Sequence, residues 1–369
     1  MNTLDENIDA ILAGPPYGLG KVEAAASVFA LLREQLIHAA GKSEVYANYV
    51  RHWPIKVEHA QKIEDLPYIP VSVFKRNPPL ALVPSDKIQR TLLSSATTGQ
   101  EPSRIAIDAL TAKRMTKGVV AILRDSIGSA RRPYLVVDTA ETNASSASLG
   151  ARGAAIRALS PFATETVYCL KGENLDIDDE ALRKFIEQHG DKPIIVYGFT
   201  SILWAKLVRP LAAKGKSLGM QQAVILHSGG WKKLVAESVT KETFNMAASQ
   251  VFGCPENRII DYYGMVENLG IIYPDCIAGN KHAPVFGAVV IRDPLTLKPV
   301  TIGGAGIVQV CSILPTSFPG HLLLTEDLAM LIAEDGCPCG RPGSAFRFVG
   351  RISKAEVRGC GNIDRQRIA

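Results

Sequence analysis

Four short apolar runs, separated by segments long enough for helices, constrain the fold of this chain more than any other feature. The runs are residues 134–137, 166–170, 194–197 and 223–226. Repetition of strand, helix and strand predicts a largely parallel sheet covered by helices on both faces. We therefore expect an α/β fold, in which ligands bind at the carboxyl ends of the strands.

The segments on either side of this alternation differ from it in character. An apolar stripe with interspersed charges over 22–40 predicts helices near the N-terminus. Beyond Pro284, shorter strands with turn signals are expected at 285–292, 306–310 and 321–325. We expect four segments in order: a helical N-terminal layer (1–60), an α/β core (61–284), a β-rich subdomain (285–350) and a hinge-like tail (351–369).

Two prolines, Pro67 and Pro70, interrupt the stretch 65–75. The residue before a proline is pushed out of the helical region, so this stretch is expected to be extended. It is either a connector or one wall of a substrate site.

Composition excludes several classes of protein. The net charge of +5 is too small and too evenly spread for a nucleic-acid-binding protein. No run approaches the roughly 18 apolar residues of a membrane span, and the N-terminus lacks the basic and apolar regions of a signal peptide. We expect a cytoplasmic protein whose seven cysteines are reduced, so metal binding and thiol reactivity are the roles to test.

A loop rich in hydroxyl groups follows the apolar run 88–93. It offers hydroxyls, a permissive backbone and a cation from Ser94, Ser95, Thr97, Thr98, Gly99 and Arg104. Such groups bind polyphosphate through charge-assisted hydrogen bonds and backbone N–H groups. The Walker pattern G-x-x-x-x-G-K-[ST] is absent from this loop. The alternative is an ordinary turn rich in serine and threonine.

Small and polar residues follow two of the expected strands. Gly198 follows the run 194–197, and His227 opens the segment His-Ser-Gly-Gly after the run 223–226. Glycines at such positions let a flat ligand approach the backbone closely. His227 is either a structural histidine or a base. In Tyr-Tyr-Gly-Met-Val-Glu, which ends at Glu267, an aromatic pair precedes a carboxylate, an arrangement that suits base stacking beside a metal ion but also fits ordinary core.

Three cysteines and a histidine predict a structural zinc site. Cys276 and His282 lie on either side of a glycine turn, and a proline-containing loop supplies Cys337 and Cys339. Four nitrogen and sulfur ligands form a closed tetrahedral site. Against this, Cys-x-Cys is tighter than the common Cys-x-x-Cys, and Cys276 could instead be a buried cysteine.

Four motifs occur in the order in which adenylate-forming enzymes carry them. Residues 94–104 resemble the phosphate loop of that superfamily, 263–267 its Y-G-x-T-E motif, 325–327 its T-G-D motif and 350–351 its hinge arginine. The resemblance implies a largely parallel sheet flanked by helices and a smaller β-rich C-terminal part. It also implies that the full C-terminal lid domain is absent or truncated.

The closer resemblance is to the acyl-protein synthetases of the bacterial luminescence fatty-acid reductase. It rests on the stretches 68–75, 197–200, 227–234, 262–267, 314–321 and 358–360. Phenylacetate–CoA ligases are similar more distantly, through T-E-D, C-x-C-G-R and the closing G-R; some of them carry zinc-type cysteine pairs.

The resemblance implies a role for each matching residue. The loop residues Ser94, Ser95, Thr97, Thr98 and Gly99 would hold the β and γ phosphates of ATP. Adenine would contact Ser228, Gly229, Gly230 and Tyr263. Glu267 would take Mg²⁺, and Asp327 and Arg351 would bind the ribose hydroxyls. Two departures are Ala96, where the family usually has glycine, and Arg104, where many relatives have lysine.

The reaction implied is activation of a fatty acid as an acyl-adenylate, followed by acyl transfer to a thiol for delivery to a reductase partner. One alternative is an acyl-CoA or acyl-carrier-protein ligase. The other is a non-catalytic scaffold that retains nucleotide binding.

Cys360 is the expected acyl acceptor. It lies between two glycines and near several basic side chains, which favour the reactive thiolate. In the luminescence relatives a cysteine near the C-terminus carries the acyl thioester, and Arg-Gly-Cys matches that position. The alternative is a structural cysteine, a description that fits Cys169 and Cys311 better.

Overall fold

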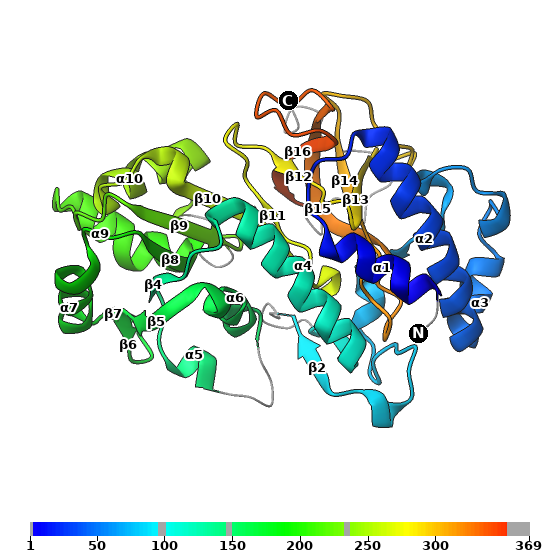
Figure 1. Cartoon of the computed structure of the whole chain (residues 1–369), viewed down its shortest axis with the longest axis horizontal. Helices are drawn as coiled ribbons and strands as arrows, with labels where there is room; N and C mark the ends of the chain where they lie inside the picture. Colours follow the sequence, from blue (N-terminus) through cyan, green and yellow to red (C-terminus); the bar gives the residue numbers. More distant parts are fainter. Residues whose placement is uncertain (1–2, 95–100, 145–149, 232–236, 353–369) are drawn as a thin grey trace. The chain divides into compact units, whose positions relative to one another are not determined.

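The structure is a computed structural model that describes residues 3–94, 101–144, 150–231 and 237–352 (Figure 1). Its contacts divide the described chain into two units. The first unit contains 3–91, 101–121 and 265–352; the second contains 92–94, 122–144, 150–231 and 237–264. The four segments expected from the sequence are consecutive, whereas each unit combines separate stretches of the chain. The expected segments therefore stay a prediction.

The second unit is built on a parallel sheet. Its strands are β4 (Arg132–Val136), β5 (Ala163–Tyr168), β8 (Ile194–Phe199), β9 (Ala223–Ser228) and β10 (Ile259–Tyr263). Through this unit the strand order is β10-β9-β8-β4-β5, and every neighbouring pair is parallel. The predicted parallel sheet is confirmed.

Helices cover both faces of this sheet (Figure 1). They are α5 (Glu141–Ala144), α6 (Ala151–Leu159), α7 (Asp179–His189), α8 (Thr200–Ile202), a π-helical turn (Leu203–Val208), α9 (Arg209–Ala213) and α10 (Lys241–Phe252). The chain passes from β4 to β5 at one edge of the sheet and then returns past β4 to β8, so the direction of the connections reverses there. Because crossovers between parallel strands are right-handed, α6 lies on one face of the sheet, and α7, α9 and α10 lie on the other. Phe185, Leu207 and Phe252 from the latter face share one apolar core with Val196 and Ile225 of the strands.

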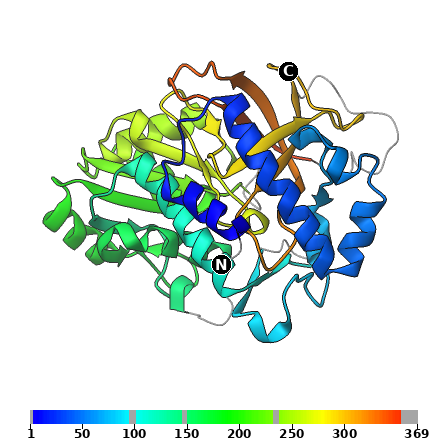
Figure 2. The same ribbon diagram turned by 45° about the vertical axis from the view of Figure 1, so that its right-hand side comes forward.

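The first unit contains an antiparallel sheet. Its strands are β12 (Lys281–His282), β13 (Gly287–Arg292), β14 (Ala305–Ser312), β15 (Leu322–Glu334) and β16 (Ser344–Arg351), in the order β12-β16-β15-β14-β13. The short strand β1 (Ile69–Pro70) pairs with β15 in parallel. Three N-terminal helices, α1 (Thr3–Ala13), α2 (Lys21–Lys42) and α3 (Glu44–Arg51), belong to this unit, and α2 lies against the sheet (Figure 2).

The remaining elements are short, apart from one helix. Helix α4 (Ala109–Ile127) begins in the first unit and ends in the second. The minor strands are β2 (Arg90–Leu93), β3 (Arg104–Ile107), β6 (Leu170–Lys171), β7 (Asp176–Ile177) and β11 (Tyr273–Pro274). Single 3₁₀ turns occupy Val57–His59, Ile63–Asp65, Val71–Lys75, Ser85–Lys87, Ser160–Phe162, Glu256–Arg258 and Val266–Asn268.

Two local expectations were wrong. The stretch 65–75 is not extended throughout, because the turn Val71–Lys75 follows directly after β1. Proline pushes only the residue before it out of the helical region, here Leu66 and Ile69, so the restriction does not reach Val71–Lys75. The strand expected at 321–325 extends to Glu334, because alternate residues along β15 are buried down its whole length.

Candidate functional site

The expected phosphate loop is only partly described. Ser95, Thr97, Thr98 and Gly99 lie outside the described residues, while Ser94 follows directly after β2. Arg104 begins β3, and its Nη2 donates a hydrogen bond to Glu101 Oε2 at 2.8 Å. Its Nη1 donates to the carbonyl of Lys75 at 3.3 Å. The Glu101 partner of Arg104 is an exposed carboxylate three residues earlier in the chain.

Asp327 and Arg351 meet across the hairpin formed by β15 and β16. They are direct partners in the antiparallel register, and Arg351 Nε donates to Asp327 Oδ1 at 2.9 Å. The Asp327 side chain is 5% exposed, whereas that of Arg351 is 71% exposed. Thr325 Oγ1 accepts a hydrogen bond from the Asp327 backbone N–H at 3.1 Å and donates to Val308 O at 2.8 Å. The T-E-D motif thus fixes a buried carboxylate beside an exposed cation.

Glu267 lies near this pair in the same unit. It sits in the 3₁₀ turn Val266–Asn268 and is buried. Burial raises the pKa of Glu267, while a hydrogen bond with Ser103 and the charge of Arg351 act to lower it. A carboxylate held in a dry site without a bound cation is costly, and a divalent cation would remove that cost.

In the second unit, the strand ends carry a ladder of buried hydroxyl groups. Phe199 at the end of β8 is level with Ser228 at the end of β9, which is level with Tyr262 of β10. Tyr197 OH lies 3.0 Å from Ser228 Oγ and accepts from Tyr262 OH at 3.2 Å. Tyr263, the expected adenine neighbour, is the last residue of β10 and is buried.

Gly229 has a backbone that an ordinary side chain disfavours. Its φ is 81°, and a Cβ added there would lie 2.6 Å from the ring of Phe199. A Cβ added to Gly230 would meet nothing within 4 Å. The fold therefore requires glycine at position 229, whereas the space beside the backbone at position 230 is open.

His227 makes local contacts within the second unit. Its Nδ1 lies 2.8 Å from Thr200 Oγ1 and 3.7 Å from Asp261 Oδ1. The ring is buried against Phe244, with 4.4 Å between ring centroids. These contacts fit the structural role considered for His227.

Sequence reasoning did not single out two polar groups that the structure places at notable positions. Ser103 is the hydroxyl that hydrogen-bonds Glu267, and it lies inside the matched stretch 94–104. Asp138 follows β4, where the strand order reverses, and it is buried. Its carboxylate binds Arg152 Nε at 2.9 Å and Thr142 Oγ1 at 2.7 Å. The dipeptide Asp-Thr directly after a buried strand was the available signal.

Cys276, His282, Cys337 and Cys339 come together in the first unit, where their ligand atoms all lie within 4.8 Å of one another. Cys276 Sγ is 3.9 Å from Cys337 Sγ, and Cys339 Sγ is 3.3 Å from His282 Nε2. A disulfide requires about 2.05 Å between sulfurs. Zinc bonds of about 2.3 Å in a tetrahedron separate two sulfurs by roughly 3.8 Å. The observed spacing suits a metal and not a disulfide.

The surroundings of this cluster favour the metal-binding forms of Cys337 and His282, whereas burial and the hydrogen bonds with Cys337 and Cys276 raise the pKa of Cys339 to about 11. Asn280 Nδ2 donates to Cys337 Sγ at 3.5 Å, and the Arg341 backbone N–H donates to Cys339 Sγ at 3.4 Å. Although burial acts to raise it, the pKa of Cys337 is lowered by hydrogen bonds from Cys339 and Asn280. Burial and the charge of Arg341 lower the pKa of His282 to about 4, so its imidazole is neutral. Thiolate and neutral imidazole are the zinc-binding forms.

The other described cysteines are buried: Cys169 and Cys254 lie in the apolar core of the second unit, and Cys311 accepts a hydrogen bond from Gln309 Nε2 at 3.6 Å. Burial raises the pKa of Cys169 and Cys311 to about 12 and that of Cys254 to about 11. These thiols are poor nucleophiles, because the thiolate is the reactive form. Cys360, the expected acceptor, lies outside the described residues.

Among the helices that the structure describes, none combines the length and the apolar character needed to cross a membrane.

Two curated relatives and a solved ligase resemble the chain. It is 23% identical over 333 residues to the long-chain-fatty-acid–luciferin-component ligase of Aliivibrio fischeri, covering 89% of this chain and 85% of the relative. The enzyme of the same name from Vibrio harveyi is 26% identical over 311 residues, with 82% and 78% covered.

Among solved structures, 2-hydroxyisobutyryl-CoA ligase in an open conformation superposes with a TM-score of 0.69 at 15% identity. The superposition covers 95% of this chain and 78% of the ligase. The same ligase in its postadenylation state gives a TM-score of 0.68, with 91% and 70% covered. These similarities confirm the fold expected for an adenylate-forming enzyme. The family model for the acyl-protein synthetase LuxE matches residues 2–369, and the chain therefore belongs to that family.

Proposed function

We propose that this protein activates a long-chain fatty acid with ATP and transfers the acyl group to a thiol of its own chain. The observation that carries the proposal is the buried Asp327 carboxylate paired with the exposed Arg351, with Glu267 nearby, in a chain of the LuxE family. The names of the curated relatives support fatty acid as the substrate class.

In the first half-reaction, a carboxylate oxygen of the fatty acid attacks the α-phosphorus of ATP. The bond from that phosphorus to the bridging oxygen breaks, and pyrophosphate leaves with the electron pair. The attacking carboxylate is already a nucleophile, so the protein contributes positioning and electrostatic stabilisation and needs no general base.

Two groups in the first unit would position the nucleotide. Asp327 accepts hydrogen bonds from both ribose hydroxyls, and Arg351 is exposed enough to turn from Asp327 towards a ligand. Glu267 would hold Mg²⁺, which neutralises charge on the separating phosphates. This role explains why a buried carboxylate with a raised pKa is kept beside a second carboxylate.

Residues from the loop and from the second unit complete the assignment. The phosphates would contact Ser94, Ser95, Thr97, Thr98, Gly99 and Arg104, and adenine would contact Ser228, Gly229, Gly230 and Tyr263. The buried hydroxyl ladder would hold the side chain of Ser228, because Ser228 Oγ lies 3.0 Å from Tyr197 OH, which accepts from Tyr262 OH at 3.2 Å.

In the second half-reaction, a thiolate attacks the acyl carbonyl carbon, and AMP leaves with the oxygen that linked it to the acyl group. We assign this thiolate to Cys360. The buried Cys169, Cys254 and Cys311 are disfavoured as acceptors, since burial raises the pKa of each. The thioester would then be delivered to a reductase partner.

The zinc proposed for Cys276, His282, Cys337 and Cys339 has a structural role. All four positions of a tetrahedron are taken by protein ligands, which leaves no open position for a substrate. The ion would join the segment before β12 and β12 itself to the turn between β15 and β16.

Labelled fatty acid tests the proposal. We expect the protein to release pyrophosphate with ATP and to retain the label after denaturing electrophoresis. Cys360→Ser should release pyrophosphate but lose hydroxylamine-labile label. Cys254→Ser is the matched control and should keep both activities, because Cys254 is buried.

Three outcomes separate the alternatives. Absence of pyrophosphate release would contradict acid activation. Label appearing only in acyl-CoA when CoA is added would make the protein a CoA ligase. Wild-type label on Cys360→Ser would move the acceptor to another thiol.

A further inference from the structure

The proposed ATP site draws two of its groups from separate segments of the first unit. Arg104, at the phosphate end, begins β3, whereas Asp327, at the ribose end, lies in β15. Strand β3 is not part of the antiparallel sheet that contains β15, so no strand pairing fixes one group relative to the other. ATP has to reach both ends at once, and other contacts must therefore set the distance between them.

The link nearest to these two groups is loose. Arg104 Nη1 donates to the carbonyl of Lys75 at 3.3 Å, and Lys75 Nζ lies 3.7 Å from Oε1 of Glu326, the neighbour of Asp327. The side chains of Lys75 and Glu326 are partly exposed, and ion pairs of this kind contribute little to stability. This link alone fixes little.

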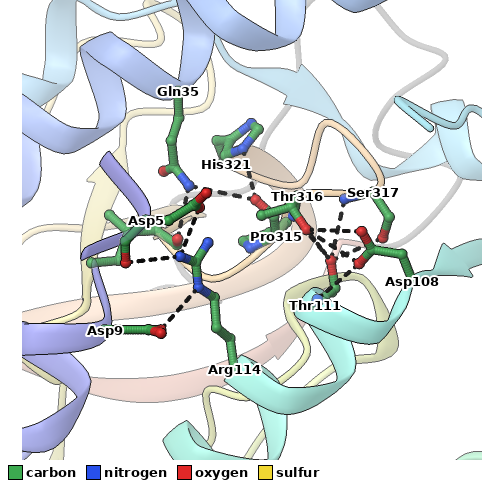
Figure 3. A network of polar contacts seen from close by, with 11 residues as sticks. Asp5, Asp9, Gln35, Asp108, Thr111, Arg114, Pro315, Thr316, Ser317 and His321 are labelled. Carbon is green, nitrogen blue, oxygen red and sulfur yellow. Dashed lines mark hydrogen bonds and ion pairs between the residues drawn. The ribbon is translucent and has the colours of Figure 1, made fainter. Parts of the chain in front are cut away.

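A second link lies at the other end of β3 and consists of hydroxyl groups (Figure 3). Thr111, in the first turn of α4, is fully buried, and its Oγ1 accepts from the backbone N–H groups of Thr316 at 3.0 Å and Ser317 at 3.2 Å. Ser317 Oγ donates to the carbonyl of Ala106 in β3 at 2.8 Å. Thr316 Oγ1 donates to Asp108, which follows β3, at 3.2 Å. These contacts join the end of β3 to the segment that leads into β15.

Every hydroxyl hydrogen of this hydroxyl network, formed by Asp108, Thr111, Thr316 and Ser317, has an acceptor. The hydrogen of Ser317 goes to Ala106 O and that of Thr316 to Asp108. Thr111 therefore donates its own to the hydroxyl oxygen of Thr316 or Ser317, at 2.8 and 3.0 Å. Asp108 also accepts from the backbone N–H of Thr111 at 2.8 Å, as an N-cap residue does. A fully paired network of this kind is costly to rearrange.

The N-terminal helices hold both partners of this network (Figure 3). Arg114, one turn further along α4, is fully buried, and it donates to Asp5 Oδ1 at 2.8 Å and to Asp9 Oδ1 at 3.3 Å, both on α1. Gln35 Nε2, on α2, donates to the carbonyl of Ile313 at 2.8 Å, in the segment that leads into β15. Helices α1 and α2 thus fix α4 and that segment from outside the proposed site.

We propose that Thr111 is a positioning residue for acid activation, because its hydroxyl network sets the separation between Arg104 at the phosphate end and Asp327 at the ribose end. This role rests on the proposed function. A ligand that uses both ends depends on their separation, whereas a ligand that uses one end does not. A misplacement of about 1 Å can lower a rate by about 10²-fold.

Three ligands test this role in the full chain. ATP uses both ends, adenosine uses only the ribose end, and tripolyphosphate uses only the phosphate end. Thr111→Val keeps the shape of the side chain but leaves two backbone N–H groups without their acceptor. By calorimetric titration with Mg²⁺ present, we expect its Kd for ATP to rise about tenfold or more and its Kd for the other two ligands to stay within about twofold. Pyrophosphate release at saturating ATP should fall about tenfold or more.

A rescue variant and a matched control accompany this change. Thr111→Ser keeps the hydroxyl group and should restore both ATP binding and pyrophosphate release. Thr116→Val should behave as wild type, because Thr116 is exposed on the same helix and its Oγ1 donates to Ala112 O of that helix at 2.9 Å.

Ser317→Ala provides a second variant, which decides the question if thermal unfolding shows that Thr111→Val is not folded. It removes the donor to Ala106 O without adding volume, and it should weaken ATP binding selectively but less than Thr111→Val.

Four results are decisive. Selective loss of ATP binding with rescue by Thr111→Ser would support the inference. Wild-type ATP binding and pyrophosphate release in the folded variants would overturn it. Equal losses for all three ligands would also overturn it and would give the network a structural role alone. Failure of the proposed function is distinguishable, since the wild-type protein itself would then release no pyrophosphate, and both proposals would fall.

Discussion

The two ends of the hairpin formed by β15 and β16 have opposite chemistry. At the open end, Asp327 and Arg351 form a hydrogen-bonded ion pair of which the cation is exposed. At the closed end, the turn between the strands carries Cys337 and Cys339, which meet Cys276 and His282. The open end offers a buried carboxylate and an exposed cation, whereas the closed end offers three thiols and an imidazole that lie close together.

This difference indicates how one hairpin can serve two purposes. An exposed arginine beside a buried carboxylate can rearrange when a ligand arrives. Four converging nitrogen and sulfur ligands lose their function if they rearrange, because the metal fixes their geometry. Two irregularities in register, between Leu328 and Ala329 and between Leu331 and Ala333, separate the closed end from the pair of Asp327 and Arg351, so the two ends can be tested separately.

The largest expected effect is at the open end. Asp327→Asn should lower the rate of pyrophosphate release about 10²–10³-fold, because a charge-assisted contact of roughly 3–4 kcal/mol is lost in the transition state. Glu267→Gln should have a similar effect through the loss of a magnesium ligand.

Glu326→Gln is the matched control for Asp327→Asn. Glu326 is the neighbouring residue, is about half exposed, and pairs with Lys75 at 3.7 Å. We expect it to keep the wild-type rate, and all three variants to keep their zinc content. Wild-type pyrophosphate release in Asp327→Asn would remove the functional distinction between the two ends.

The next effect is at the closed end. Metal analysis should find one zinc per wild-type chain and well under one in Cys337→Ser. With free zinc about a hundredfold above its Kd, the lost binding should lower the free energy of unfolding by about 2.7 kcal/mol. The variant should still release pyrophosphate when folded.

Chelation provides an internal control for this experiment. A chelator should lower the thermal midpoint of the wild-type protein to that of Cys337→Ser and leave the variant unchanged. A wild-type protein with no zinc would make the cluster a small apolar contact of cysteines with Ala333 and Ala345, which pack beside them.

The sequence predicted the residues at both ends of the hairpin but not how they meet. The residues at both ends were named from motifs, because thiols, imidazoles and carboxylates are chemically distinctive wherever they lie. Their juxtaposition depends on a register that no motif states. That register depends on the turn 335–343, where Asp335 accepts from the backbone N–H of Gly343 at 2.6 Å and has a φ of 57°, and on two irregularities further along the strands.

The parallel sheet was the most predictable part of the molecule. Its strands are buried on both faces and therefore appear as short continuous apolar runs, such as 194–197 in β8. Contacts between distant segments were not predictable. Ser103 reaches Glu267 across more than 160 residues, and Arg114 reaches Asp5 across 109, so no local pattern links either pair.

The smallest expected effect returns to Glu267 and concerns stability. Its pKa is raised in the folded protein, chiefly by burial, so the folded state binds its proton more tightly than the unfolded state. Stability should therefore fall as the pH rises from about 4.3, the unfolded pKa, to the folded pKa, and should stay level above it.

Glu267→Gln removes this penalty while keeping the size of the side chain. It should raise the free energy of unfolding at pH 7 and flatten the fall in stability above pH 4.3. Chemical denaturation at pH 4, 5.5 and 7 would measure both effects. Asp327→Asn serves as the comparison, since Asp327 is buried next to Arg351 and its replacement should not stabilise the protein. If Glu267→Gln were less stable than wild type at pH 7, its carboxylate would be a structural group, and the open end would not trade stability for catalysis.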